Sequence, residues 1–333
     1  MRKFLTQACL TLGFFGGASM VHAAECGNVS LAVMNVQSAE VLTYIDKFIL
    51  TEAFDCNVET VPGDTVPTVT SMVEKGQPDV SSETWVDLLP EIFPRGISEG
   101  KIITAAAALR DGGVQGWWIP KYLADAHPEI KTMEDALKHP ELFPDPEDSS
   151  KGAIFNGAQG WGATVVTAQL FKALGAAEKG FTLIDPGSAA GLDGAIAKSY
   201  ERKEGFIAYY WAPTSLLGKY ELVLLQNPTP HNPEEWKRCT TVADCPDPKA
   251  NAWAVDHIYT VVTKSFAEHT SKEVMDYLNK RNWSNDTVGK LLAWETDNQA
   301  TGEDGALHFL KENKEIWHDW VSPEAAAKID AAL

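Results

Sequence analysis

Three tryptophans lie where apolar, strand-like runs of the sequence give way to loops. Trp85 follows the run 78–84, Trp161 lies in a glycine-rich turn after residues 153–155, and Trp211 ends the run 206–211, which Pro213 stops. Open α/β sheets hold ligands at the carboxyl ends of their strands, so rings at three such ends can face one site. Aromatic faces arranged around a cavity attract a methylated ammonium group, whose positive charge is delocalised over its methyl groups and which has no hydrogen to donate. The pattern therefore predicts an aromatic cage, with ordinary core packing of each ring as the alternative.

Two polar candidates accompany the rings. Glu83 precedes Trp85 by two residues, so strand alternation puts both on one side. Its carboxylate would repel a carboxylate-bearing ligand there; the alternative is a solvated or paired surface acid. Asn35 begins the turn 35–38, where a strand passes into a helix and backbone amides can bind an oxygen-bearing end of a ligand or simply cap the helix.

Further aromatic candidates lie beside these motifs. Trp117 and Trp118 are adjacent, and in a strand they point to opposite faces, so at most one of them can face the site. Tyr210 precedes Trp211 and is a further candidate for ligand contact.

The elements that must position these residues alternate between strand and helix. Residues 29–33, 58–61 and 78–82 read as strands and 38–50 and 66–75 as helices; the alternation repeats over residues 153–211. It predicts α/β architecture, with parallel sheets covered on both faces. Residues 239–256 are polar and proline-rich, which indicates a surface excursion. The C-terminal part of the chain is predicted to be helical, and four of its tryptophans are expected in the core: Trp283, Trp294, Trp317 and Trp320.

Four motifs in order resemble one family: residues 79–85, 116–122, 160–162 and 209–213. Over roughly the whole mature chain, the sequence resembles the periplasmic substrate-binding proteins of ABC transporters for glycine betaine, choline and related osmolytes. The resemblance implies a two-lobe, type II-like periplasmic binding protein fold with the ligand in the interlobe cleft. It also implies an ABC permease as partner, a monomer, no cofactor and no enzymatic activity. The expected division is lobe I over 24–110, lobe II over 111–258 and a return to lobe I over 259–333, with hinges at 109–114 and 256–262.

The N-terminus has the features of a secretory signal. Arg2 and Lys3 precede an apolar run, and small residues near Ala23 and Ala24 suit cleavage. The run is too short to favour a membrane anchor. We therefore expect residues 1–23 to be removed and the protein to be exported to the periplasm. Its formal net charge of −18 disfavours binding to nucleic acid or to anionic lipid.

Four cysteines follow the signal segment, and four allow three disulfide connectivities. Cys239 and Cys245 share one loop, and Cys26 and Cys56 precede two strands that we expect to be neighbours. We predict the pairs Cys26–Cys56 and Cys239–Cys245. No histidine stands at ligand spacing from either pair, which disfavours zinc.

Other chemistry has weaker support. The glycines near Trp161 lack the dinucleotide spacing and a following Lys-Ser/Thr, and the sequence has neither a nucleophile elbow nor a zinc-protease helix. The acidic stretches 145–148 and 297–304 are solvated loops or calcium ligands. We expect trimethylamine N-oxide as the ligand, ahead of choline and glycine betaine. The alternatives are an exported enzyme acting on a methylated amine, and a binder of proline or another amino acid.

Overall fold

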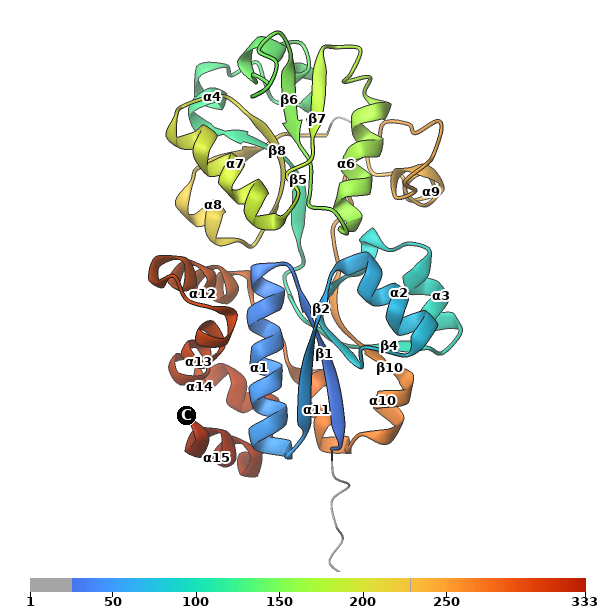
Figure 1. The fold of residues 1–333 in the computed structure, drawn as a ribbon, viewed down its shortest axis with the longest axis vertical. Helices are drawn as coiled ribbons and strands as arrows, with labels where there is room; N and C mark the ends of the chain where they lie inside the picture. The colour runs from blue at the N-terminus through green and yellow to red at the C-terminus, as the bar shows by residue number, and fades with distance from the viewer. Residues whose placement is uncertain (1–25, 228) are drawn as a thin grey trace, which may run out of the picture.

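The structure, a computed structural model, describes residues 26–227 and 229–333, so the predicted signal segment lies outside the described residues. Two lobes lie one above the other along the longest axis (Figure 1), and each is built on a five-stranded sheet. Helices cover the faces of both sheets, which confirms the predicted α/β class.

The first lobe holds the sheet β2-β1-β3-β10-β4. Its strands are β1 (Asn28–Met34), β2 (Asn57–Gly63), β3 (Val80–Trp85), β4 (Ile102–Ala107) and β10 (Ile258–Thr263). Its helices before the crossing are α1 (Gln37–Phe54), α2 (Thr65–Lys75), the short turn η1 (Val86–Leu88) and α3 (Ile92–Ser98). After the return come α10 (Lys264–His269), α11 (Lys272–Lys280), α12 (Asn285–Asn298), α13 (Gly302–Glu312), α14 (Lys314–Trp317), η4 (His318–Trp320) and α15 (Pro323–Ala332).

The second lobe holds the sheet β7-β6-β8-β5-β9. Its strands are β5 (Val114–Pro120), β6 (Gly152–Phe155), β7 (Phe181–Ile184), β8 (Ile207–Ala212) and β9 (Leu222–Leu224). Its helices are α4 (Lys121–Ala126), α5 (Met133–Ala136), η2 (Pro140–Leu142), α6 (Gly162–Ala173), α7 (Ala189–Glu201), α8 (Ser215–Lys219), α9 (Pro233–Glu235) and the π-helical turn η3 (Trp236–Thr240).

The strands that alternate with helices are parallel as predicted, β1 with β2 and β3, and β6 with β7 and β8. Each sheet also contains antiparallel strands, so both sheets are mixed and the prediction of parallel sheets holds only in part. Strand β10 runs antiparallel to β3 and β4, and β5 runs antiparallel to β8 and β9. These are the strands that follow the two interlobe crossings. Each enters its sheet from the side where the carboxyl ends of the parallel strands lie, and therefore runs antiparallel to those strands. Between the lobes the crossings lie side by side, where the Gly113 N–H donates to the Asp256 carbonyl at 3.1 Å.

The first lobe is anchored on α1, which lies beside the sheet in Figure 1. Its apolar residues at helical spacing are fully buried, including Val41, Ile45 and Ile49. Asp46 on the same helix pairs with Arg281 at 2.7 Å, and both side chains are inaccessible to water. The pair fixes α1 against the segment that follows α11, because removing either partner would leave a buried charge uncompensated.

The C-terminal helices bury most of their tryptophans, as predicted. Trp283, Trp317 and Trp320 are buried, while Trp294 is half-buried and stacks on His308 with the ring centroids 3.8 Å apart. None of the four lines the cavity described below. Their role in the structure is packing within the first lobe.

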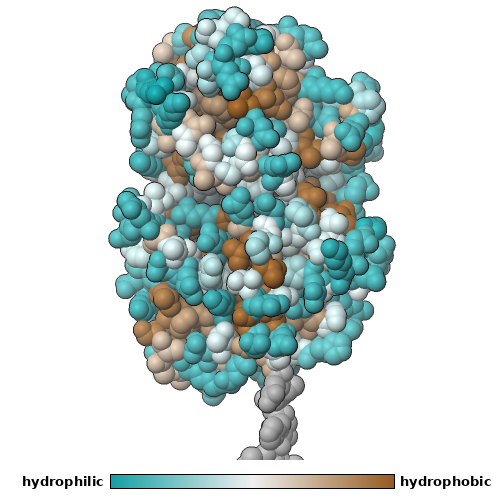
Figure 2. Space-filling model, in the orientation of Figure 1, coloured by the Kyte–Doolittle hydropathy of each residue, from teal (hydrophilic) through white to brown (hydrophobic). Residues whose placement is uncertain are grey.

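The two predicted disulfides are present. Cys26 pairs with Cys56 at the starts of the neighbouring strands β1 and β2, and Cys239 pairs with Cys245. Hydrophilic residues dominate the face drawn in Figure 2, with hydrophobic residues confined to small patches. Over residues 26–227 and 229–333, no helix has the length and apolar character needed to cross a membrane.

Candidate functional site

An aromatic cavity lies between the lobes. The first lobe contributes Trp85 and Leu88 and the second lobe contributes Trp161, Tyr209 and Trp211; Val36, Thr65 and Ala163 complete the lining. The centre of a water-sized sphere can occupy only about 20 Å³ within it. That is room for about one water molecule, so a larger ligand requires the rings to separate.

The second lobe's rings form one packed group. The centroids of Trp161 and Trp211 lie 4.9 Å apart with the rings nearly perpendicular. Tyr209 stacks roughly parallel to Trp211 at 6.1 Å. All three are at least 94% buried, so their faces are shielded from competing water. Such rings attract a cation more strongly when desolvated than at an exposed surface.

Trp85 is held by a buried acid and by a crossing segment. Its indole Nε1–H donates to Glu83 Oε1 at 3.0 Å, and the Ser38 hydroxyl donates to the same oxygen at 2.9 Å. A Cβ on Gly113 would come within 2.2 Å of the Trp85 ring, so only glycine lets the first crossing pass so close. The ring is therefore fixed at its polar end by Glu83 and along its edge by the crossing.

Glu83 itself does not line the cavity but lies behind Trp85. Burial raises the pKa of its carboxyl group, against the lowering effects of the Trp85 and Ser38 bonds and of the Arg281 charge. Among the described residues none donates to Glu83 Oε2, which is sealed from water. Glu83 therefore has no direct contact with a ligand in the cavity and influences it only through the Trp85 indole. It offers a negative charge to a cationic ligand only when its carboxyl group is ionised.

Trp161 is held across the lobe boundary. Its indole Nε1–H donates to Asp64 Oδ1, on the first lobe, at 3.2 Å, and the Val66 N–H donates to the Gly160 carbonyl at 3.4 Å. Partial burial raises the pKa of Asp64, while the bonds from Trp161 and from the Asn35 backbone amide lower it. Asn35 itself does not belong to the cavity lining, whereas the next residue, Val36, does.

Tyr209 is a cavity residue that sequence reasoning missed. Its hydroxyl donates to Gln115 Oε1 at 2.8 Å, and Gln115 Nε2 donates to the Asp256 carboxyl group. Burial raises the pKa of Asp256 to about 8, Gln115 lowers it and the Asp87 charge raises it further. Tyr209 precedes Trp211 by two residues on β8, so strand alternation alone could have placed both rings on one face.

The other aromatic candidates lie outside the lining. Tyr210 projects from the opposite face of β8, where its hydroxyl donates to Asp193 Oδ1 at 2.7 Å. Trp117 is buried in the core, and Trp118 is half-buried with its indole N–H donating to the Tyr210 carbonyl at 3.0 Å. The structure thus brings Trp85, Trp161 and Trp211 together and leaves Tyr210, Trp117 and Trp118 behind the site.

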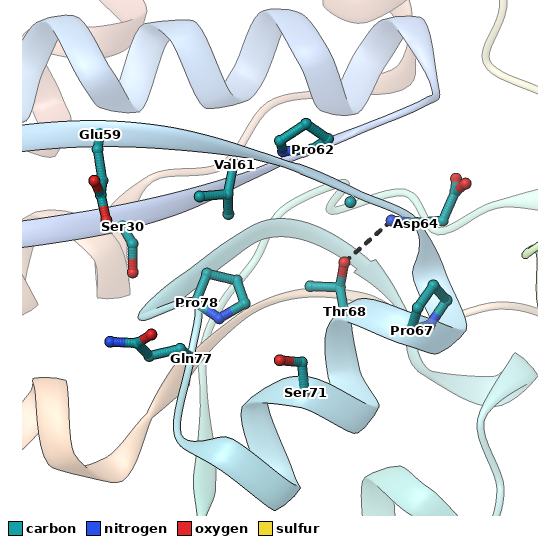
Figure 3. A pocket seen from close by; sticks show the side chains of 11 residues that line it. Ser30, Glu59, Val61, Pro62, Asp64, Pro67, Thr68, Ser71, Gln77 and Pro78 are labelled. Atoms are coloured by element: carbon teal, nitrogen blue, oxygen red, sulfur yellow. Dashed lines mark hydrogen bonds between the residues drawn. The ribbon is translucent and has the colours of Figure 1, made fainter.

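A second, larger depression belongs to the first lobe alone. It measures about 490 Å³ and is open to solvent, with Ser30, Glu59 and Gln77 on its wall. Figure 3 shows the Asp64 carboxylate turned away from this depression and its backbone N–H bonded to the Thr68 hydroxyl. The depression lacks aromatic rings and does not involve the second lobe, so it offers no cage.

The acidic stretches have local roles. Asp145 Oδ1 accepts the Glu147 backbone N–H at 2.8 Å, and Asp304 forms a capping box with Thr301 at the start of α13. Within the part of the chain that the structure describes, no three His, Cys, Asp or Glu side chains are grouped to hold a metal ion.

Two lobes that share a cavity at their boundary are the architecture of a two-lobe solute-binding protein. Residues 27–312 match the family described as OpuAC, the substrate-binding domain of an ABC-type glycine betaine transport system. The chain belongs to this family.

Individual relatives agree with this assignment. The chain is 23% identical to the trimethylamine N-oxide-binding protein of Pelagibacter ubique, over 95% of this chain and 98% of that protein. An ABC-transporter choline-binding protein solved with choline has a TM-score of 0.71 and 17% identity, covering 92% and 98% of the two chains. Lactococcal OpuAC, solved closed with glycine betaine, has a TM-score of 0.67 and 16% identity, covering 89% and 100%. The two structural matches confirm the periplasmic binding protein fold.

Proposed function

We propose that this protein is an exported solute-binding protein that captures a methylated ammonium osmolyte between its lobes and delivers it to an ABC permease. The observation that carries the proposal is the composition of the cavity lining, in which rings from both lobes converge and no Asp, Glu, Lys, Arg or His takes part. Each desolvated cation–π contact contributes up to ~2 kcal/mol. A few such contacts with apolar burial suffice for the ~8 kcal/mol of micromolar binding.

The acids behind the cage favour a ligand that presents positive charge to the rings. Glu83 and Asp64 accept hydrogen bonds from the indole N–H groups of Trp85 and Trp161, so when ionised they place negative charge at the polar edges of these rings. Negative charge there adds to the attraction of the ring faces for a cation. The same charge repels a ligand carboxylate.

Trimethylamine N-oxide is the ligand that we favour, with choline next and glycine betaine third. The lining offers no cationic side chain for the carboxylate of glycine betaine, and burying that charge unpaired is costly. Thr65 belongs to the lining, and a threonine hydroxyl can donate to a single oxygen. The rings also need to separate least for the smallest of the three compounds.

The binding role is tested by a thermal-shift panel of trimethylamine N-oxide, choline, glycine betaine and proline, each at the same concentration. A methylated compound should raise the melting temperature most, because a ligand that binds only the folded state stabilises it. A shift with proline alone would overturn the proposal. Recovery of the ligand unchanged after incubation, measured by NMR, separates binding from the alternative of an exported enzyme.

A further inference from the structure

The segment 232–253, which we call the strap, is built as part of the second lobe. It contains α9, η3 and the Cys239–Cys245 disulfide. Figure 1 shows α9 beside α6. Gln169 Nε2 on α6 donates to the Val242 and Ala243 carbonyls at 2.7 and 2.6 Å. These bonds tie the strap to the second lobe, and the disulfide closes a loop within the strap itself.

Polar side chains stiffen the strap from within. Glu235 is buried and accepts two hydrogen bonds from Arg238, at 2.8 and 3.0 Å. The Asn251 amide donates to the Asn232 carbonyl at 3.0 Å and to the Thr240 hydroxyl at 3.2 Å, which ties the end of the strap to its beginning. A residue on the strap is therefore held in a fixed position relative to the second lobe.

One strap residue reaches the first lobe. The indole Nε1–H of Trp236 donates to the Asp87 carbonyl of η1 at 2.8 Å, and the Trp236 side chain is buried. Asp87 lies between the cavity residues Trp85 and Leu88. Its carboxylate accepts the His257 backbone N–H at 2.6 Å, which ties η1 to the return crossing. Because donor and acceptor belong to different lobes, opening the lobes breaks the bond.

A second strap residue connects this contact to the cage. Trp253 stacks on Tyr209 at 5.3 Å between centroids and meets Trp236 nearly edge-on at 6.2 Å. Tyr209 in turn lines the cavity. A continuous row of rings therefore runs from the ligand cavity to the interlobe hydrogen bond.

We propose that Trp236 is a positioning residue that latches the lobes closed, so that its hydrogen bond to Asp87 retards ligand release without taking part in ligand contact. The latch rests on the proposed function only in the choice of probe ligand. Closure precedes formation of the bond, so the latch acts on the dissociation rate rather than on the association rate.

The test replaces Trp236 by Phe, which keeps a ring and removes the N–H donor. Stopped-flow tryptophan fluorescence measures association and release of trimethylamine N-oxide. Loss of one hydrogen bond is expected to speed release about three- to tenfold, with association unchanged. The double variant Cys239→Ser, Cys245→Ser removes the covalent cross-link next to Trp236 and loosens the strap, so it should also speed release.

The matched control is Trp317→Phe. The Trp317 indole donates to the Leu310 carbonyl at 2.7 Å, entirely within the first lobe, so its loss should lower stability and leave the release rate unchanged. Folded Trp236→Phe protein that releases the ligand at the wild-type rate would overturn the latch. So would wild-type release from the double cysteine variant, should Trp236→Phe fail to fold.

A ligand-independent measurement separates failure of the latch from failure of the proposed function. Dyes on Lys75→Cys and Lys179→Cys, both exposed and on different lobes, report opening by single-molecule energy transfer. Trp236→Phe should shorten the dwell time of the closed state even if trimethylamine N-oxide does not bind. Equal dwell times in both proteins would contradict the latch whatever the ligand is.

Discussion

Replacing Trp211 by Ala should weaken binding of trimethylamine N-oxide about thirty- to 150-fold. The ring lines the cavity and is only 6% exposed. Its loss removes a desolvated cation–π contact of up to ~2 kcal/mol and about 1 kcal/mol of apolar burial on the ligand. Two to three kcal/mol corresponds to the stated loss of affinity. Titration calorimetry measures it directly.

Two further variants make the result interpretable. Removing a large buried ring also costs ~3–5 kcal/mol of folding stability, so Trp211→Phe, which keeps part of the packing, should give an intermediate affinity. Trp118→Phe is the control, because Trp118 lies in the same sheet but outside the lining. Its affinity should stay within about twofold of the wild type, since it loses no cavity contact. A folded Trp211→Ala protein with wild-type affinity would refute the cage.

Three other perturbations test the surroundings of the site. Glu83→Gln should raise the affinity for glycine betaine relative to trimethylamine N-oxide at pH 8.5, by calorimetry; glycine betaine binding at least tenfold tighter than trimethylamine N-oxide in the wild type, with no effect of the substitution, would contradict this role. The pKa of Asp256 is about 8 in the folded protein and near 3.8 when the residue is exposed. Between these two pH values the folded chain keeps a proton that the unfolded chain has lost, so folding stability falls by up to ~1.4 kcal/mol for each pH unit, and the fall ends above about pH 8. Asp256→Asn should flatten that slope in denaturant titrations at pH 5, 6.5 and 8, and an unchanged slope would rule the residue out as its source. Replacing Cys26 and Cys56 by Ser opens a loop with a sequence separation of 30 and should lower the free energy of unfolding by about 3.5 kcal/mol, whereas unchanged denaturation would show that the pair is dispensable.

The tryptophans at strand ends were predictable because two simple regularities place them. Ligand sites lie at the carboxyl ends of strands, and alternate residues of a strand share a face. The same rule applied to residues 209–211 favours Tyr209 over Tyr210 as the partner of Trp211, and the structure places only Tyr209 in the lining.

The strap was not predictable in this way. Most of the strap falls within residues 239–256, which have no periodicity and a polar composition and therefore read as a surface excursion, yet Cys239 and Asn251 of the strap are buried. Trp253 finds its place on Tyr209 through tertiary packing, which leaves no local signal in the sequence. The antiparallel strands after the crossings also escaped prediction, since chain direction at a lobe boundary depends on the whole topology.

A crystal structure of the protein with trimethylamine N-oxide tests the central claim most directly. The account predicts the methylated nitrogen between Trp85, Trp161, Tyr209 and Trp211, with methyl carbons about 4 Å from the ring faces. The N-oxide oxygen should point toward Thr65. Ligand bound in the open depression of the first lobe, or bound between the lobes without contact to these rings, would contradict it.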